Sequence, residues 1–165
     1  MSVGIADTLL REPTRADGAS IHALIESCPP LDLNSVYAYL LICEHFASTS
    51  VVARGPTGET LGFISAYVPP GRDDVLFVWQ VAVSEQARGQ RLAQRMLESL
   101  LKRPLLAGIN FIETTVGPDN VASRKTFGAL AQARDASVAE SPLFTPDLFG
   151  AASHEDERLL RIGPL

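Results

Sequence analysis

The feature that most restricts the fold is an apolar run that passes through a short basic turn into an amphipathic helix. The run over 75–83 reads VLFVWQVAV, and a strand this apolar belongs in the middle of a sheet with both faces covered. After the turn, apolar residues recur at helical spacing at Leu92, Met96, Leu97 and Leu100. A buried strand followed by such a helix indicates an α/β arrangement.

The rest of the chain consists of short segments with helical or alternating apolar periodicity. Thr14 and Asp17 match a capping box, and Ile21, Leu24 and Ile25 follow at helical spacing. One helix is predicted from this box to Pro29, and a second over 31–46, with Asp32 or Asn34 as its cap and Tyr39 in its apolar stripe. A further helix is predicted over 120–130. Strands are predicted over 8–11, 50–54, 60–68, 111–116, 131–138 and 158–162.

These segments predict an α/β (α+β) fold with a mixed central sheet of about six to seven strands flanked by about four helices. The polar stretch 141–157 is expected to be a loop. We expect a single domain over residues 1–165, with residues 1–7 disordered.

Charge and composition exclude several classes of protein. The formal charge of −5 and the pI near 5.1 disfavour a nucleic-acid partner and suit a cationic amine substrate. We see no apolar span of membrane length and no signal peptide, so we expect a cytoplasmic protein without a membrane partner. Cys28 and Cys43 form no CxxC motif, lie among apolar residues and are expected to be buried thiols.

The turn between the central strand and its helix has the properties of an anion site. Amides at a helix start and the positive end of the helix dipole favour a diphosphate. Arg88 and Arg91 add charge, and Gly89 lets a ligand approach the backbone closely. Neither the Walker pattern nor the GxGxxG pattern is present.

Residues 88–93 resemble the coenzyme A loop of the GCN5-related N-acetyltransferase (GNAT) superfamily, Arg/Gln-x-x-Gly-x-Gly/Ala after an apolar strand. Arg91 stands where the pattern has its first glycine, and Ala93 fits the last position. The resemblance implies acetyl-coenzyme A as co-substrate, no metal, and transfer of the acetyl group to a primary amine. The coenzyme-binding residues it implies are Val81, Ala82, Val83, Arg88, Gly89, Gln90, Arg91, Leu92, Ala93, Asn120 and Ser123.

Three of these positions have more specific expectations. By the same resemblance, the amides of Val81 and Val83 lie where the strand splays from its neighbour and stabilise the oxyanion of acyl transfer. Asn120 contacts the coenzyme, caps the following helix, or does both. Ser123 either contacts the coenzyme or is an ordinary surface serine.

Three longer motifs look like the L-2,4-diaminobutyrate acetyltransferase family: DLNSxYxYLLxCxHF over 32–46, VWQVAV over 78–83 and HExE over 154–157. The likeness extends over 9–162. It implies acetylation of the 4-amino group of L-2,4-diaminobutyrate in ectoine synthesis. It also implies a cytoplasmic homodimer that serves osmotic stress protection.

The amine substrate needs a base, because a primary amine has a pKa of roughly 10.4 and arrives protonated. The strand over 75–83 carries no carboxylate. The candidates are Asp32 and Glu157, with His154 as a third, acting directly, through water, or as binders of the ammonium groups. Asp32 could instead be a helix cap, and Glu157 an exposed charge.

Two aromatic residues are candidates for contact with the substrate. Trp79 shares a sheet face with Val81 and forms a pocket wall, stacks on a substrate ammonium group as a cation–π partner, or packs in the core. Tyr37 could bind the substrate carboxylate. Phe127 stands where the superfamily often has a tyrosine acid, so the general acid is unassigned.

Two other functions stay open at this point. The acceptor could be another small diamine, an amino acid or a protein N-terminus. Alternatively, the chain could be a non-catalytic sensor that binds coenzyme A.

Overall fold

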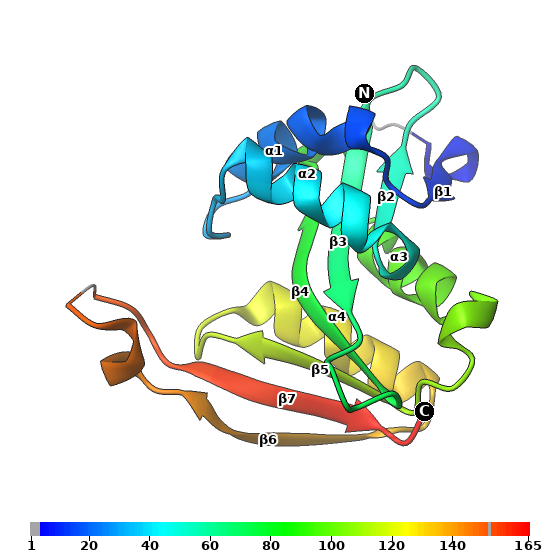
Figure 1. Ribbon diagram of the computed structural model, residues 1–165. Helices are drawn as coiled ribbons and strands as arrows, with labels where there is room; N and C mark the ends of the chain where they lie inside the picture. Colours follow the sequence, from blue (N-terminus) through cyan, green and yellow to red (C-terminus); the bar gives the residue numbers. More distant parts are fainter. Residues whose placement is uncertain (1–3, 152) are drawn as a thin grey trace. The chain divides into compact units, whose positions relative to one another are not determined.

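The computed structural model describes residues 4–151 and 153–165 (Figure 1). These residues form a seven-stranded mixed sheet and four α-helices, as the sequence predicted. In chain order the elements are β1 (Leu9–Arg11), α1 (Gly18–Glu26), α2 (Val36–His45), β2 (Val51–Arg54), β3 (Thr60–Tyr67), β4 (Val75–Val83), α3 (Leu92–Leu101), β5 (Phe111–Val116), α4 (Val121–Ala133), β6 (Ser137–Phe144) and β7 (Glu157–Gly163).

The strand order is β1-β2-β3-β4-β5-β7-β6, which places β4 fourth of seven, in the middle of the sheet as predicted. The chain divides into two compact units. Unit 1 comprises Met1–Tyr67 and Gln80–Ala107, and unit 2 comprises Val68–Trp79 and Gly108–Leu165.

Unit 1 has helices on both faces of its strands. Phe63 of β3 packs in the apolar cluster of α1 and α2, together with Ile21 and Tyr39. A Cβ built on the neighbouring Gly62 would lie 2.8 Å from the methyl carbon of Met96 in α3. Because successive side chains of a strand point to opposite faces, α3 covers the face opposite α1 and α2.

The 3-10 turn Arg15–Asp17, which leads directly into α1, confirms the predicted capping box. The backbone N–H of Thr14 donates to the Asp17 carboxylate at 2.7 Å, and Arg11 pairs with the same carboxylate at 2.7 Å. Burial alone would raise the pKa of Asp17, but the bonds from Arg11 and Thr14 lower it overall. A charged Asp17 therefore joins β1 to the first helical segment.

Unit 2 is built around β5. Residues Val75–Val78 of β4 pair with β5 in parallel, and β7 pairs with β5 antiparallel on its other edge. The buried Glu113 carboxylate of β5 accepts from Arg72 at 2.9 Å and from Arg161 at 2.7 Å. Two arginines thus compensate the one carboxylate that β5 buries.

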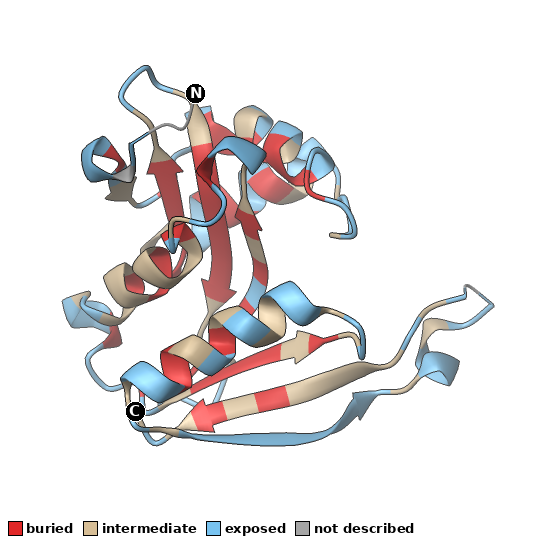
Figure 2. Ribbon diagram, turned by 180° about the vertical axis from the view of Figure 1, so that it is seen from behind, coloured by how far each residue is buried: buried red, intermediate tan, exposed pale blue. Residues whose placement is uncertain are grey.

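The strand predicted over 131–138 was wrong in its bounds. α4 runs on to Ala133, and β6 covers Ser137–Phe144, which includes part of the stretch expected to be a loop. Every residue of β6 is exposed (Figure 2). With neither face buried, the strand has no apolar alternation to reveal it, and Pro142 is tolerated because β6 is an edge strand.

The second helix begins later than predicted. α2 starts at Val36, and its cap is Ser35, whose hydroxyl accepts from the amide of Ala38 at 3.2 Å. Asp32 and Asn34 are therefore not the cap. The buried face consists of Tyr39, Ile42 and Cys43, and α2 also exposes apolar side chains.

Other expectations concern the start of the chain and the thiols. Residues 1–3 lie outside the described part, and Ile5–Asp7 forms a 3-10 turn within the segment expected to be disordered. Cys28 and Cys43 are buried free thiols, as predicted, and burial raises the pKa of Cys43 to about 11. Among the described residues, no helix has the length and apolarity that crossing a membrane would need.

Candidate active site

The connection from β4 to α3 has an unusual backbone. After a 3-10 turn over Glu85–Ala87, Gly89 adopts φ +75°, and Arg91 adopts φ 60° and ψ 27° at the N-cap of α3. Left-handed backbone suits glycine and costs about 1–2 kcal/mol for other residues. Arg91 therefore holds a left-handed backbone that glycine adopts more readily, and it adds a guanidinium to the loop.

The first turn of α3 presents main-chain donors. The amides of Leu92, Ala93 and Gln94 have no acceptor within the helix, because no residue lies four positions before them in it. The N-cap Arg91 makes no side-chain capping bond. Nothing lies within 4 Å of a Cβ built on Gly89, so the space beside the loop is open. Open donors at the positive end of a helix form an anion site.

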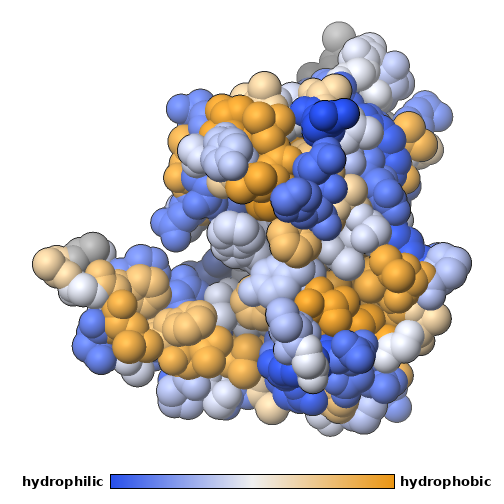
Figure 3. All heavy atoms as spheres, viewed as in Figure 1, coloured by the Kyte–Doolittle hydropathy of each residue, from blue (hydrophilic) through white to orange (hydrophobic). Residues whose placement is uncertain are grey.

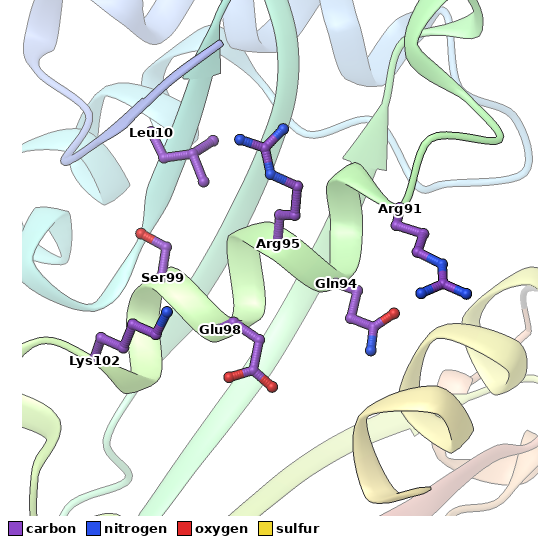
Figure 4. Close-up of a pocket in the computed structure, with 7 residues that line it drawn as sticks. All are labelled: Leu10, Arg91, Gln94, Arg95, Glu98, Ser99 and Lys102. Carbon is purple, nitrogen blue, oxygen red and sulfur yellow. The ribbon is translucent and has the colours of Figure 1, made fainter. Parts of the chain in front are cut away.

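A hollow of about 530 Å³ extends from Arg91 along α3 (Figure 4). It is lined by Leu10, Arg91, Gln94, Arg95, Glu98, Ser99 and Lys102. Three cationic side chains against one carboxylate favour an anionic occupant. The hollow thus continues the positive charge of the loop within unit 1.

The residues of β4 alternate in burial. Leu76, Val78, Gln80 and Ala82 are buried, whereas Phe77, Trp79, Val81 and Val83 are partly exposed. The ladder to β5 pairs Val78 with Thr114, and there the Val78 carbonyl accepts from the Thr114 hydroxyl at 2.9 Å. A side-chain hydroxyl therefore donates to β4 at Val78. This is compatible with the expectation that β4 splays from its neighbour at Val81 and Val83, and that expectation stays a prediction.

The amine-side candidates of unit 1 lie before and within α2. The residues Asp32 and Tyr37 are exposed, Tyr37 by 68%. The backbone carbonyl of Asp32 accepts from the buried Gln80 of β4 at 2.7 Å. The sequence reasoning missed Gln80, although a polar residue within VLFVWQVAV is itself a signal, because a buried amide requires partners.

The remaining candidates lie in unit 2. The Trp79 side chain is 46% exposed, so the alternative prediction that it packs in the core is wrong. The Asn120 side chain accepts from the Ser123 amide at 3.2 Å, which confirms the capping role. The His154 ring stacks on Phe149 with centroids 3.8 Å apart, and its Nδ1 lies 2.6 Å from the Glu155 carbonyl oxygen.

Glu157 begins β7, paired with Phe144 of β6, and is partly buried. Phe127 is buried and has no ionisable proton, so it cannot act as the general acid that a tyrosine often provides in the superfamily.

The candidate residues are divided between the two units. Unit 1 holds the loop 88–93 with Val81, Val83, Asp32 and Tyr37, and unit 2 holds Trp79, Asn120, Ser123, His154 and Glu157. Among the described residues, no three His, Cys, Asp or Glu side chains form a metal-ligand group.

Comparison with known proteins gives a consistent result. Residues 19–130 match the acetyltransferase (GNAT) family. An L-2,4-diaminobutyric acid acetyltransferase of Bordetella parapertussis is 59% identical over 155 residues, 94% of this chain and 83% of that protein. One from Methylotuvimicrobium alcaliphilum is 48% identical, covering 94% of this chain and 90% of its own length.

A solved structure agrees with these relatives. It is the diaminobutyrate acetyltransferase of Paenibacillus lautus in complex with L-2,4-diaminobutyric acid and coenzyme A. It superposes with a TM-score of 0.91 at 39% identity and covers 95% of each chain. The chain therefore belongs to the acetyltransferase (GNAT) family and, within it, to the L-2,4-diaminobutyric acid acetyltransferases.

Proposed function

We propose that this protein transfers the acetyl group of acetyl-coenzyme A to the 4-amino group of L-2,4-diaminobutyrate, in ectoine biosynthesis. The class of enzyme, an N-acetyltransferase, follows from the family. The Paenibacillus lautus relative, with both coenzyme A and diaminobutyrate bound, supports the choice of substrates.

The observation that carries the coenzyme site is the start of α3. Gly89 and Arg91 hold left-handed backbone, and the first amides of the helix are open to a ligand. The diphosphate would accept from these amides, with Arg88 and Arg91 adding charge-assisted contacts. In this position the thioester would lie toward Val81 and Val83, whose amides are the proposed oxyanion donors.

On the amine side, carboxylates and aromatic surfaces are the expected ligands. The exposed Asp32 carboxylate and Glu157 would bind the ammonium groups and, with His154, would pass the proton of the reacting amine to water. The exposed ring of Trp79 would form the wall against the aliphatic substrate, and the Tyr37 hydroxyl would bind its carboxylate.

The single domain over 1–165, the homodimer, the cytoplasmic location and the role in osmotic stress complete the proposal. The exposed apolar side chains on β6 and the following turn support a dimer, because large apolar surface favours association. They are Val138, Leu143, Phe144 and Leu148. Figure 3 shows apolar surface over the turn that follows β6 and the neighbouring end of that strand.

A thiol-release assay tests this function directly. Purified protein with acetyl-coenzyme A is offered diaminobutyrate, ornithine, lysine and a peptide with a free N-terminus. Release of coenzyme A with diaminobutyrate at the highest kcat/KM is expected, and NMR of the product should show acetylation at nitrogen 4. A preference for another amine would correct the substrate. Tight binding of acetyl-coenzyme A without thiol release would favour the sensor.

A further inference from the structure

A buried polar network in unit 1 joins β4 to the segment that precedes α2. Its centre is Gln80, which is 5% exposed and lies on the inward face of β4 with Ala82. The Gln80 side chain accepts from the Tyr39 hydroxyl at 3.1 Å and donates to the Asp32 carbonyl at 2.7 Å. The Asn34 amide in turn donates to the Tyr39 hydroxyl at 3.4 Å. Two side chains therefore hold the main chain at both ends of residues 32–34.

The roles of donor and acceptor in this network are fixed. The Asp32 carbonyl can only accept, so the nitrogen of the Gln80 side chain must face it and the oxygen must face Tyr39. The Tyr39 ring is fully buried and packs edge-on against Phe63, with ring centroids 6.5 Å apart. The backbone amide of Gln80 donates to the Ser65 hydroxyl at 3.1 Å, which fixes the strand itself. Tyr39 and Gln80 are therefore both held by contacts with buried residues of β3.

The segment held in this way carries the exposed acidic side chain of Asp32. Asp32 is exposed although its carbonyl is tied to Gln80. A polar network buried under an apolar helix costs desolvation, which a wholly apolar contact would avoid. Precise placement of an exposed functional group is a use that offsets this cost.

We propose that Gln80 and Tyr39 are positioning residues for the amine substrate. They fix the main chain of residues 32–34 to β4, one residue before Val81, so that the Asp32 carboxylate keeps a set distance from the proposed oxyanion donors. This inference rests on the proposed function, because it takes Asp32 as a ligand of the substrate ammonium group. It assigns specificity for the amine to two residues that need not touch it.

The main test compares Tyr39→Phe with Thr49→Val. Tyr39→Phe removes one buried hydroxyl from the network and leaves the ring in place. Thr49→Val removes one buried hydroxyl elsewhere in unit 1, where Thr49 donates to the Ala66 carbonyl at 2.6 Å. Each variant loses the two hydrogen bonds of one hydroxyl, so each should lose comparable stability. Only Tyr39→Phe should act on the amine.

The expected result for Tyr39→Phe is a KM for diaminobutyrate raised roughly 5- to 10-fold, because the network loses the hydroxyl that ties Asn34 to Gln80. The KM for acetyl-coenzyme A should stay within about twofold, since the loop 88–93 is intact. Gln80→Met leaves both Tyr39 and the Asp32 carbonyl without this partner, and should raise the amine KM further, by more than about 10-fold. Thr49→Val should change neither KM.

The outcomes separate the two proposals. If the unmodified enzyme does not acetylate diaminobutyrate, the proposed function fails. If it does, but Tyr39→Phe leaves the amine KM unchanged or raises both KM values equally, the positioning role is overturned. If Gln80→Met fails to fold, Tyr39→Phe still decides. Calorimetric titration of diaminobutyrate into the coenzyme A complex gives a readout without turnover, and it should show the same selective loss of affinity.

Discussion

α2 and α3 begin in opposite ways, and the difference separates a structural helix start from a binding one. α2 is closed by Ser35, whose hydroxyl accepts from the third amide of the helix. α3 begins at Arg91 in left-handed backbone without a side-chain capping bond. A cap satisfies an orphan amide within the chain, whereas an open start leaves it for a ligand. Stability is gained at the first start, and the second start is the proposed site for the diphosphate of the coenzyme.

The largest expected effect comes from closing the open start. Gly89→Val places a β-branched residue at φ +75° and should weaken acetyl-coenzyme A binding roughly 10- to 100-fold, as for one or two lost charge-assisted hydrogen bonds. Isothermal titration with acetyl-coenzyme A measures this. Gly58→Val is the matched control, because Gly58 has φ +86° and nothing within 4 Å of a built Cβ either. Both variants should lose about 1–2 kcal/mol of stability, and unchanged affinity in Gly89→Val would remove the loop from the coenzyme site.

Arg91 allows charge to be separated from backbone conformation. Arg91→Ala and Arg91→Gly both remove the guanidinium, and both should weaken acetyl-coenzyme A binding about 3- to 10-fold, less so at high salt. Arg91→Gly should be more stable than Arg91→Ala by about 1 kcal/mol, because φ 60° costs glycine little. Thermal unfolding measures the difference in stability, and titration with acetyl-coenzyme A at two salt concentrations measures the loss of affinity and its dependence on salt. Equal stability of the two variants would show that the left-handed N-cap is not maintained.

Asn120 combines the two kinds of helix start, since it caps α4 and is also a proposed coenzyme ligand. Asn120→Ser keeps a good cap but loses the amide group, so the KM for acetyl-coenzyme A should rise about 3- to 10-fold with little change in Tm. Asn120→Ala should add a loss of about 1 kcal/mol in stability. If Asn120→Ser kept the original KM, the role of Asn120 would be capping alone.

The smallest functional effect is expected at the closed start. Ser35→Ala should cost about 1 kcal/mol in the free energy of unfolding, while the affinity for acetyl-coenzyme A stays unchanged. Chemical denaturation and titration of the same preparation check both quantities. A clear loss of acetyl-coenzyme A affinity in Ser35→Ala would break the distinction between the two helix starts.

Where apolar periodicity is strong, the fold could be predicted from the sequence. The buried residues of α3 are the four that recur at helical spacing, and β4 has its predicted bounds and its place in the middle of the sheet. The edge strand β6 is exposed throughout and was placed wrongly, because propensity and alternation have nothing to report where no face is buried. The late start of α2 was missed because three residues near it, Asp32, Asn34 and Ser35, can all cap a helix.

For the candidate site, residues close together in the chain were the predictable part. The loop 88–93 and its helix are one local unit, so their residue types alone indicated an anion site. The left-handed backbone at Arg91 has no sequence signal, since arginine rarely adopts it, and the surrounding structure must impose it. Gln80 could have been marked as unusual, but its partners lie 41 and 48 positions earlier in the chain.

The amino-acid sequence by itself determined the central strand, the helix that follows it, the basic turn between them and the family resemblance, because each depends on residue types at short spacing. Only the tertiary structure decided which helix start stays open, which exposed residues have a fixed main chain, and that Tyr39 and Gln80 share a buried network. Hydrogen bonds between distant segments require a fold to bring their donors and acceptors together, and no local pattern encodes that distance.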